Sequence, residues 1–515
     1  MKKIISTVFV VTVMFLSCGD KFLVSDPKTV LPTDVALETQ AGLESAIYSL
    51  YDFPRMHLRN MVYCYYFIAG TPLLKAKGLL TADWGITLYN SQLNPTHKAT
   101  TSFWDTSYIA LNQANAIIER APTIAFDDDV KRNRLLAEAR FFRAYILFYL
   151  EQRFENIPLI TSEVKAPMNT YRPASKEAIY QVILEDLAFA TATLDSTYDQ
   201  TGRITKGTAF HLLAKVYMVL QRWSDAAVAA LNVINSGKYE LLADRSQLWA
   251  DNSQNNLEGV YVIQFSTDPL DGEGHQLAQQ FNPLIDRING VKRSWENGGR
   301  PWARYYPSEY LLGLFEQTDE RLGADYKTVW IYDDESAFEK TIKVLPTNAT
   351  DSIEIHLGDT VKAEYVNNEM YYGPACKKYW EYGGHGRSLS EVASKKSVYR
   401  FRLAETYLIA GEALWRNGDA ANGLAMINVV RTRAKATPYT DADMTEDKII
   451  EEYFRELAFE QEDWFLLKRL GRLVTMNKTF SPDKDETEID ENNVRMPIPQ
   501  SFIDATPGYP QNPGY

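Results

Sequence analysis

The sequence predicts a mostly α-helical protein, in which a scaffold of repeated helix pairs is interrupted by a long irregular insertion containing short β-strands. Two observations support the scaffold: apolar residues recur at helical spacing over much of the chain, and one helix–turn–helix pattern occurs twice. A third observation defines the insertion. Between the two copies, short β-branched and aromatic runs separated by Gly and Pro replace the helical period.

Four helices are predicted before the first copy of the pattern. The clearest covers residues 129–153 and carries one continuous apolar stripe. The stripe consists of Leu135, Ala139, Phe142, Ile146 and Tyr149. The other three helices are expected at residues 39–53, 101–121 and 176–194. Residues 54–100 contain several Gly and Pro residues and are predicted to be irregular.

The repeated pattern covers residues 206–235 and residues 399–434. A shift of 196 positions aligns Ala214 with Ala410, and each copy has a helix, a short turn and a second helix. Small side chains where two helices cross let the helices approach closely, so the purpose of these Ala residues is packing. Each copy therefore resembles a tetratricopeptide repeat.

The insertion is expected at about residues 238–398. Its short strands are predicted at residues 260–265, 328–332, 341–345 and 353–365. Gly358-Asp359 is a plausible hairpin turn between two of them. Because long structured loops on a rigid scaffold often carry binding residues, this insertion is where a ligand site is expected.

The first 17 residues predict a secretory signal peptide. Lys2 and Lys3 precede an apolar stretch from Ile4 to Leu16, which is too short to span a bilayer but suits a signal-peptide core. The stretch ends just before Cys18. A secretory signal that stops on a cysteine resembles the bacterial lipoprotein signal, in which that Cys is acylated and becomes the first residue.

This interpretation divides the chain into a signal peptide at residues 1–17, a lipidated tether at residues 18–38 and a single domain at residues 39–515. Lipidation of Cys18 would anchor the protein to a membrane, and no later segment is apolar enough to span one. The alternative is an ordinary secreted protein with an incidental cysteine. Cys64 and Cys376 could pair, but their spacing carries no disulfide signal, and free buried thiols are expected.

Composition and motifs exclude several functions. The net charge of −13 argues against nucleic acid as a partner and against a polybasic membrane patch. The chain has no Gly-rich phosphate loop, no HExxH or CxxC metal motif and no GxSxG nucleophile elbow, so neither a cofactor nor a metal is expected. Two catalytic carboxylates far apart in sequence are not excluded in this way, which leaves a glycoside hydrolase open.

Several motifs in order resemble the SusD/RagB family of outer-membrane nutrient-binding lipoproteins. They are CGDKFL at residues 18–23, WDTSYIALNQANAII at 104–118, AEARFFRAYILFYLEQRFENIPL at 137–159, YPSEYLLGLFEQTDERL at 306–322, FRLAETYLIAGEAL at 401–414, MPIPQSF at 496–502 and the terminal QNPGY. The resemblance covers nearly the whole chain. Residues 455–469 depart from it, because Gln461, Asp463 and Leu466 stand where the family usually has Gly, Arg and Asp. That departure puts local packing or a partner contact in doubt.

The resemblance implies a scaffold of about four tetratricopeptide-like helix pairs and a non-enzymatic function. Such proteins lie on the cell surface at the outer membrane and cap a SusC-like TonB-dependent transporter barrel as a lid. They capture oligosaccharides, or peptides in some branches, and deliver them to the barrel. The implied function is therefore surface glycan binding. Peptide capture by the same fold and a surface-anchored glycoside hydrolase are the alternatives.

Two loops carry the candidate ligand-binding residues. A sugar ring lies flat on Trp or Tyr, while nearby Asn, Asp and Arg side chains bind its hydroxyls, so a few exposed rings on one face suffice. The candidates are Trp84, Tyr89 and Asn90 in the first loop and Arg293, Trp295, Asn297, Arg300, Trp302, Tyr305 and Tyr306 in the second. The alternative is that Trp302 and Tyr305 only pack the loop onto the scaffold. Tyr382 and its neighbours beside GGHGRS are expected to contact either ligand or transporter.

Overall fold

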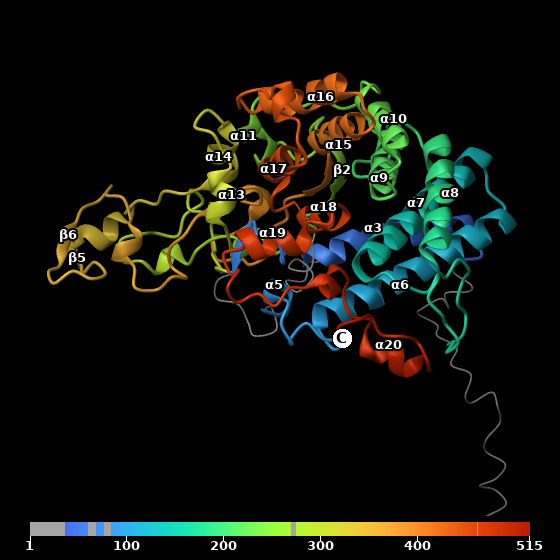
Figure 1. The fold of residues 1–515 in the computed structure, drawn as a ribbon, viewed down its shortest axis with the longest axis horizontal. Helices are drawn as coiled ribbons and strands as arrows, with labels where there is room; N and C mark the ends of the chain where they lie inside the picture. The colour runs from blue at the N-terminus through green and yellow to red at the C-terminus, as the bar shows by residue number, and fades with distance from the viewer. Residues whose placement is uncertain (1–36, 60–67, 77–83, 269–273, 461) are drawn as a thin grey trace, which may run out of the picture.

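The computed structural model describes residues 37–59, 68–76, 84–268, 274–460 and 462–515. The predicted signal peptide, Cys18 and Cys64 lie outside these residues. The long helices pack together in one part of the molecule, and the irregular insertion projects away from them (Figure 1). The mostly α-helical fold class is therefore confirmed. No helix in the described part of the chain combines the length and the apolar character needed to cross a membrane.

The helices before the repeated pattern confirm the predictions, with one difference. They are α3 (Gln40–Arg59), α6 (Lys98–Arg120), α7 (Asp129–Phe154) and α8 (Lys176–Thr193). Helix α3 was expected to end at Phe53 but continues through Pro54 for a further turn and a half. Because Pro54, His57 and Leu58 are all buried, packing of this face outweighs the backbone hydrogen bond that Pro removes.

The two copies of the helix–turn–helix pattern stack on each other. They comprise α9 (Lys206–Val219) with α10 (Trp223–Ile234), and α15 (Leu403–Arg416) with α16 (Ala420–Arg433). Helix α10 packs directly against α15, so the scaffold continues across the insertion (Figure 1). At the α15–α16 crossing, a Cβ on Gly423 would lie 2.7 Å from the carbonyl oxygen of Gly411, which explains why only glycine fits there.

Antiparallel strand pairs hold the insertion to the scaffold. The pairs are β1 (Leu74–Ala76) with β3 (Tyr305–Pro307), β2 (Gly259–Ile263) with β8 (Val398–Arg402), β4 (Tyr326–Lys327) with β7 (Ala375–Cys376), and β5 (Ile342–Val344) with β6 (Ile353–Ile355). Strand β2 follows α10 and β8 leads into α15. Their pairing therefore closes the insertion and brings the two helix pairs together.

Two strand predictions in the insertion are wrong. Residues 328–332 form only a single bridge, between Ile331 and Thr360. Gly358-Asp359 does not join two strands, because the β5–β6 hairpin closes earlier, between Val344 and Ile353. Gly358, with a φ of 90°, instead turns the chain back so that its N–H donates to the carbonyl oxygen of Tyr332 at 2.8 Å.

The remaining elements complete the scaffold and the insertion. Short helices in or before the insertion are α5 (Trp84–Leu88), α11 (Arg245–Leu248), α12 (Leu277–Gln280), α13 (Glu309–Gly313) and α14 (Glu320–Asp325). Those after α16 are α17 (Glu446–Leu457), α18 (Asp463–Arg469), α19 (Leu473–Phe480) and α20 (Gln500–Ala505). The C-terminal segment returns to the first half of the chain, where the amide of Asn512 donates to the carbonyl oxygen of Phe154 at 2.6 Å.

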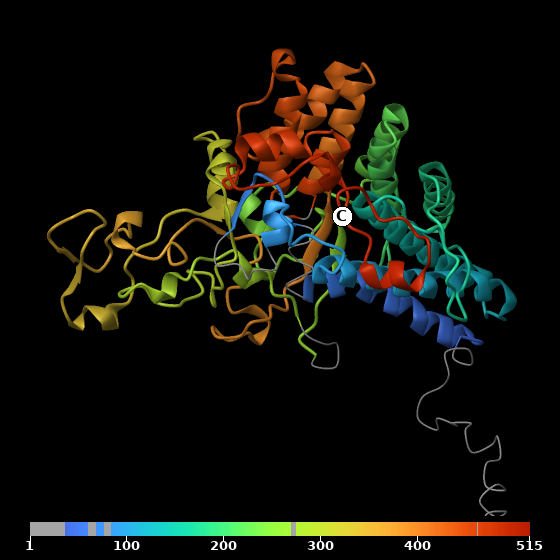
Figure 2. The ribbon, with the colours of Figure 1, turned by 60° about the horizontal axis from the view of Figure 1, so that its bottom comes forward.

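The β5–β6 hairpin lies at the end of a projection, far from the helices in both views (Figures 1 and 2). The projection has a small hydrophobic core of its own, which includes Trp330, Tyr332, Ile342 and Trp380. The insertion therefore has one end paired to the scaffold through β2 and β8 and another end that reaches away from it.

Candidate functional site

In the first predicted loop, Tyr89 and Asn90 are held by contacts within the protein. Tyr89 is only 4% exposed; its hydroxyl donates to the carbonyl oxygen of Gly70 at 2.6 Å and accepts from the indole of Trp464 at 3.1 Å. Asn90 caps its own turn, since its side-chain oxygen accepts from the N–H of Gln92. Trp84 begins α5, and its contact with ligand stays a prediction.

Tyr305 and Tyr306 also lie in the interior, at 1% and 2% exposure. Both belong to β3, which pairs with β1 and carries them beneath the loop. The hydroxyl of Tyr306 donates to the carbonyl oxygen of Met370 at 2.7 Å. These two rings and Tyr89 therefore pack the loops onto the scaffold and offer no face to a ligand, which corrects the sequence-based assignment.

Trp295 stays at the surface as a half-buried ring held between two glycines. A Cβ on Gly299 would lie 3.2 Å from Cζ3 of the indole, and a Cβ on Gly383 would lie 3.0 Å from its Nε1. Both glycines have positive φ angles, of 70° and 81°. The backbone thus approaches the indole at both ends, which restricts the movement of the ring.

Trp302 is half-buried as well, and guanidinium groups lie over it. The carbon Cζ of Arg300 is 4.5 Å from the centre of the ring and that of Arg304 is 5.5 Å away. The loop is fixed by its backbone, because the N–H of Trp302 donates to the carbonyl oxygen of Gln279 in α12. One face of the Trp302 ring is therefore covered by the guanidinium of Arg300, which stacks on it.

The polar candidates of the second loop divide into two groups. The amide of Asn297 is buried and donates to the carboxylate of Asp333 at 2.9 Å, so Asn297 is a structural residue. Arg293 is exposed and pairs with Asp286, with 2.7 Å between Nε and Oδ2. Arg300 donates to the side-chain oxygen of Gln279. Burial lowers the pKa of Arg300 and the charge of Arg293 lowers it further.

A cleft of about 690 Å³ opens beside this loop, between α11, α14 and residues 377–382. Residues that line it include Trp249, Asp251, Asn252, Glu320, Lys377 and Tyr382. Tyr382 is 48% exposed and precedes Gly383, the residue in contact with Trp295. Tyr382 lines the cleft, Trp295 contacts Gly383, the residue after Tyr382, and Trp302 follows Trp295 along the second loop. We call these three rings the aromatic rim.

Asp251 holds the part of the rim that contains Tyr382. Its carboxylate accepts from the backbone N–H groups of Tyr382 at 2.7 Å and of Gly384 at 3.1 Å. Beneath it, burial lowers the pKa of Lys396 to about 8, an effect that the charges of Asp251 and Glu381 partly offset. Sequence reasoning missed Asp251 and Asn252, because nothing in their local sequence distinguishes them from ordinary loop residues.

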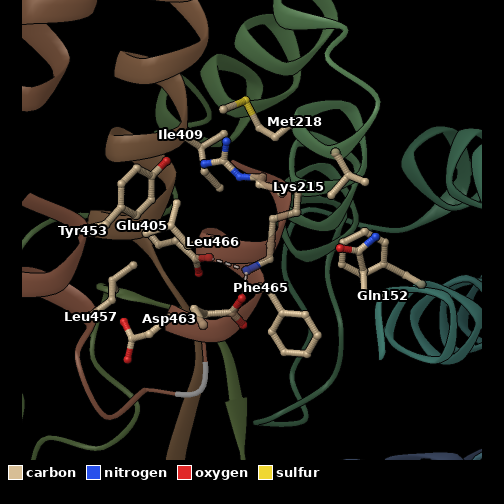
Figure 3. Close-up of a pocket in the computed structure, with 14 residues that line it drawn as sticks. Gln152, Lys215, Met218, Glu405, Ile409, Tyr453, Leu457, Asp463, Phe465 and Leu466 are labelled. Atoms are coloured by element: carbon tan, nitrogen blue, oxygen red, sulfur yellow. Dashed lines mark hydrogen bonds and ion pairs between the residues drawn. The ribbon is translucent and has the colours of Figure 1, made fainter. Parts of the chain in front are cut away.

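A second, enclosed cavity of about 40 Å³ lies among α7, α9, α15 and α18 (Figure 3). Lys215 donates to both Glu405 and Glu462 at its edge, and Asp463 and Leu466 line it. The cavity has room for a few waters at most, so it is not a site for a glycan. Gln461 lies outside the described residues, while Asp463 and Leu466, the other two departures from the family pattern, are packing residues here.

Metal binding and thiol chemistry find no support in the described part of the chain. No three His, Cys, Asp or Glu side chains gather there in a group that could hold a metal ion. Cys376 is a buried free thiol, and burial raises its pKa to about 12, so it stays protonated at neutral pH. His211 is fully buried between Thr406 and Glu405, which makes it a structural residue.

The stacked helix pairs and the insertion with its cleft define a helical-repeat protein with an irregular insertion. The SusD family pattern matches residues 258–515, and a second pattern, described as starch-binding associating with outer membrane, matches residues 21–218. This chain belongs to the SusD family.

Curated relatives and solved structures agree with this membership. The chain is 25% identical to SusD-like protein P2 of Formosa agariphila over all of both chains. It is 26% identical to the starch-binding protein SusD of Bacteroides thetaiotaomicron over 75% of this chain and 74% of that one. A laminarin-binding SusD-like protein has the same fold, with a TM-score of 0.73 and 22% identity over 93% of this chain and all of that one.

Proposed function

We propose that this protein is a cell-surface lipoprotein that binds glycans and delivers them, as a lid, to a SusC-like TonB-dependent transporter, without catalysing a reaction itself. The observation that carries the glycan proposal is the aromatic rim beside the 690 Å³ cleft. Rings give flat surfaces for sugar C–H groups, and Asn252 and Lys377 place hydroxyl-binding groups in the cleft that Tyr382 lines.

The names of its relatives support the same ligand class. Those relatives are described as binding laminarin, starch and a xylogluco-oligosaccharide. Family membership supports the outer membrane as the location, Cys18 as the anchor and a transporter barrel as the partner. Peptide capture has no specific observation in its favour, so it enters as an outcome of the test.

The test is calorimetric titration of the chain lacking residues 1–18 with laminarin, starch and xyloglucan oligosaccharides and with a peptide mixture. We expect heat with at least one glycan and no release of reducing sugar. Trp295→Ala and Tyr382→Ala should each weaken binding by about 1–3 kcal/mol, the range of a central contact. Trp223→Ala is the matched control, because Trp223 is half-buried on α10, outside the insertion.

Three results would contradict the proposal. Heat with peptides and with no glycan would assign the protein to peptide capture. Release of reducing sugar would make it an enzyme. Equal affinity of the Trp295 and Tyr382 variants and the wild type, with the fold intact, would place the glycan site elsewhere.

A further inference from the structure

Arg300 is an arginine without an acidic partner, in a protein with 13 more acidic than basic side chains. Within the described residues its one hydrogen-bond partner is the neutral side chain of Gln279, and no carboxylate lies within ion-pair distance of it. It stacks on Trp302, so its guanidinium is fixed in place. Most other arginines that the structure describes pair with Asp or Glu.

The acidic residues around Arg300 are already engaged with other groups. Asp286 pairs with Arg293, and Asp251 accepts from the backbone of residues 382 and 384. Glu381 accepts from His385 at 3.1 Å. Glu296 is bound within its own turn, where hydrogen bonds from its backbone and from Ser294 lower its pKa. The charge of Asp286 partly offsets the effects of burial and of Arg293 on the pKa of Arg300, but none of these carboxylates forms an ion pair with Arg300 in the described part of the chain.

A second guanidinium adds to the positive charge at this end of the rim. Arg387 is only 5% exposed, and its Nη2 donates to the carbonyl oxygen of Glu391. Among the described residues its Nε and Nη1 have no hydrogen-bond partner, and the carboxylate of Glu381 lies 3.8 Å from Nη1. Its Nη1 lies 4.0 Å from the position of a Cβ on Gly299, the residue before Arg300. Arg293 is exposed nearby, so three guanidinium groups surround the Gly299–Arg300 turn.

Trp295 joins this cationic turn to the cleft. Gly299 contacts one end of its indole and Gly383, which follows Tyr382, contacts the other. A sugar ring on Trp295 would therefore have Tyr382 and the cleft on one side and Arg300 on the other. A fixed guanidinium beside an aromatic ring suits an anionic group attached to a sugar, because it offers parallel N–H donors in a planar fork.

We propose that the site selects acidic glycans, with the carboxylate of a uronic acid or a sulfate ester bound by Arg300 while the sugar ring stacks on Trp295. This inference rests on the proposed glycan-binding function and names the class of glycan. Arg387 raises the positive potential from beneath, and Trp302 holds the Arg300 side chain ready, so little of its conformational freedom is lost on binding.

The experiment compares matched pairs of ligands by calorimetry on the chain lacking residues 1–18. One pair is oligogalacturonate and its methyl ester, and another is a sulfated galactan oligosaccharide and its desulfated form. The neutral laminarin and xyloglucan oligosaccharides complete the panel. We expect an acidic member to bind at least about tenfold more tightly than its neutral partner, and to lose affinity as salt increases. The pair that shows the difference distinguishes carboxylate from sulfate.

Arg300→Gln should abolish the preference for the acidic member, and Arg300→Lys should retain part of it, because the charge remains but the planar fork is lost. Lys343→Gln on β5 removes the same charge from the projection and should leave the preference unchanged. Tight binding of neutral glycans with no preference for acidic ones would overturn this inference while the proposed function stands. Binding of no glycan in the panel would overturn both.

Discussion

Glu456, near the end of α17, and Asp463, at the start of α18, are both buried, yet their surroundings favour opposite protonation states. Burial alone would raise the pKa of Glu456, but the charges of Arg245, Arg433 and Arg402 hold it well below its ordinary value. Burial raises the pKa of Asp463 well above its ordinary value, and the charge of Lys378 offsets this only in part. The surroundings of Glu456 therefore favour its anion, whereas those of Asp463 favour its protonated form.

Replacing Asp463 with Asn should stabilise the protein at pH 8 and have little effect at pH 4. The folded protein holds a proton on Asp463 that the unfolded chain releases, so stability falls as pH rises from the ordinary Asp range through the raised pKa. Asn has no proton to release. We expect a gain in Tm of about 1–3 °C at pH 8, measured by calorimetry. A Tm that falls at pH 8 but not at pH 4 would show instead that Asp463 stabilises the protein as an anion.

Gly383→Ala should weaken glycan binding through Trp295. Gly383 has a positive φ, and a Cβ there would lie 3.0 Å from the indole nitrogen, so the ring must shift. Gly386→Ala is the matched control, since Gly386 also has a positive φ but no atom within 4 Å of the added Cβ. Both variants should lose about 1 kcal/mol of stability to backbone strain. Only Gly383→Ala should bind glycan more weakly in calorimetry. Equal glycan affinities of the two variants would show that Trp295 is not part of the binding site.

At the scale of elements, the longer helices and three of the strands, β2, β5 and β6, were predictable, whereas β1, β3, β4 and β7 were not. Helix α7 (Asp129–Phe154) carries an apolar stripe from Leu135 to Tyr149, and this period predicted a helix at residues 129–153, one residue short of the observed end. Strands β4 and β7 have two residues each and pair across about 50 positions, and no local period marks them. The same limit applies to the site. Trp302 and Tyr305 are neighbours in sequence, and only the distant pairing of β3 with β1 buries the second.

The helix α17 anchors an extended buried ion network between the scaffold and the insertion. Glu456 accepts from Arg402 at 2.9 Å and from Arg433 at 2.7 Å, and it also pairs with Arg245 at the start of α11 and with Arg321 in α14. The Arg-Leu-Ala-Glu motif of the family supplies Arg402. The network therefore connects α17 to three elements that are distant in sequence.

Glu456→Gln should destabilise the protein by about 3–5 kcal/mol, because it leaves buried arginines without their shared anion. Glu451→Gln is the control on the same helix. Glu451 pairs with Lys448 and Arg455 at a partly exposed position, so its loss should cost less than about 1 kcal/mol. Urea unfolding followed by circular dichroism measures both. Similar losses in the two variants would mean that the network contributes no more than a surface pair.

At the scale of the whole molecule, the order of elements places a rigid helical scaffold on one side and a binding insertion on the other (Figure 2). The stacking of α10 on α15 makes the scaffold continuous although some 165 residues separate the two helices in sequence. The repeated helix–turn–helix pattern predicted the two helix pairs, whereas the packing of α10 on α15 is seen only in the structure. The direction in which the insertion extends depends on contacts among loops and could not be predicted.

The anchor is the remaining prediction about the whole molecule. If Cys18 is acylated, several chains insert into the membrane, and their combined apolar surface makes attachment stable where one chain would be marginal. Cys18→Ser should therefore abolish labelling of the expressed protein by radioactive palmitate and release it from the outer-membrane fraction. Cys64→Ser is the control for loss of a cysteine elsewhere in the chain, and it should change neither the labelling nor the membrane attachment. Labelling that persists in Cys18→Ser would contradict the prediction that Cys18 is the lipid anchor. The released protein should still bind glycan, because the proposed binding site and the tether lie in different parts of the chain.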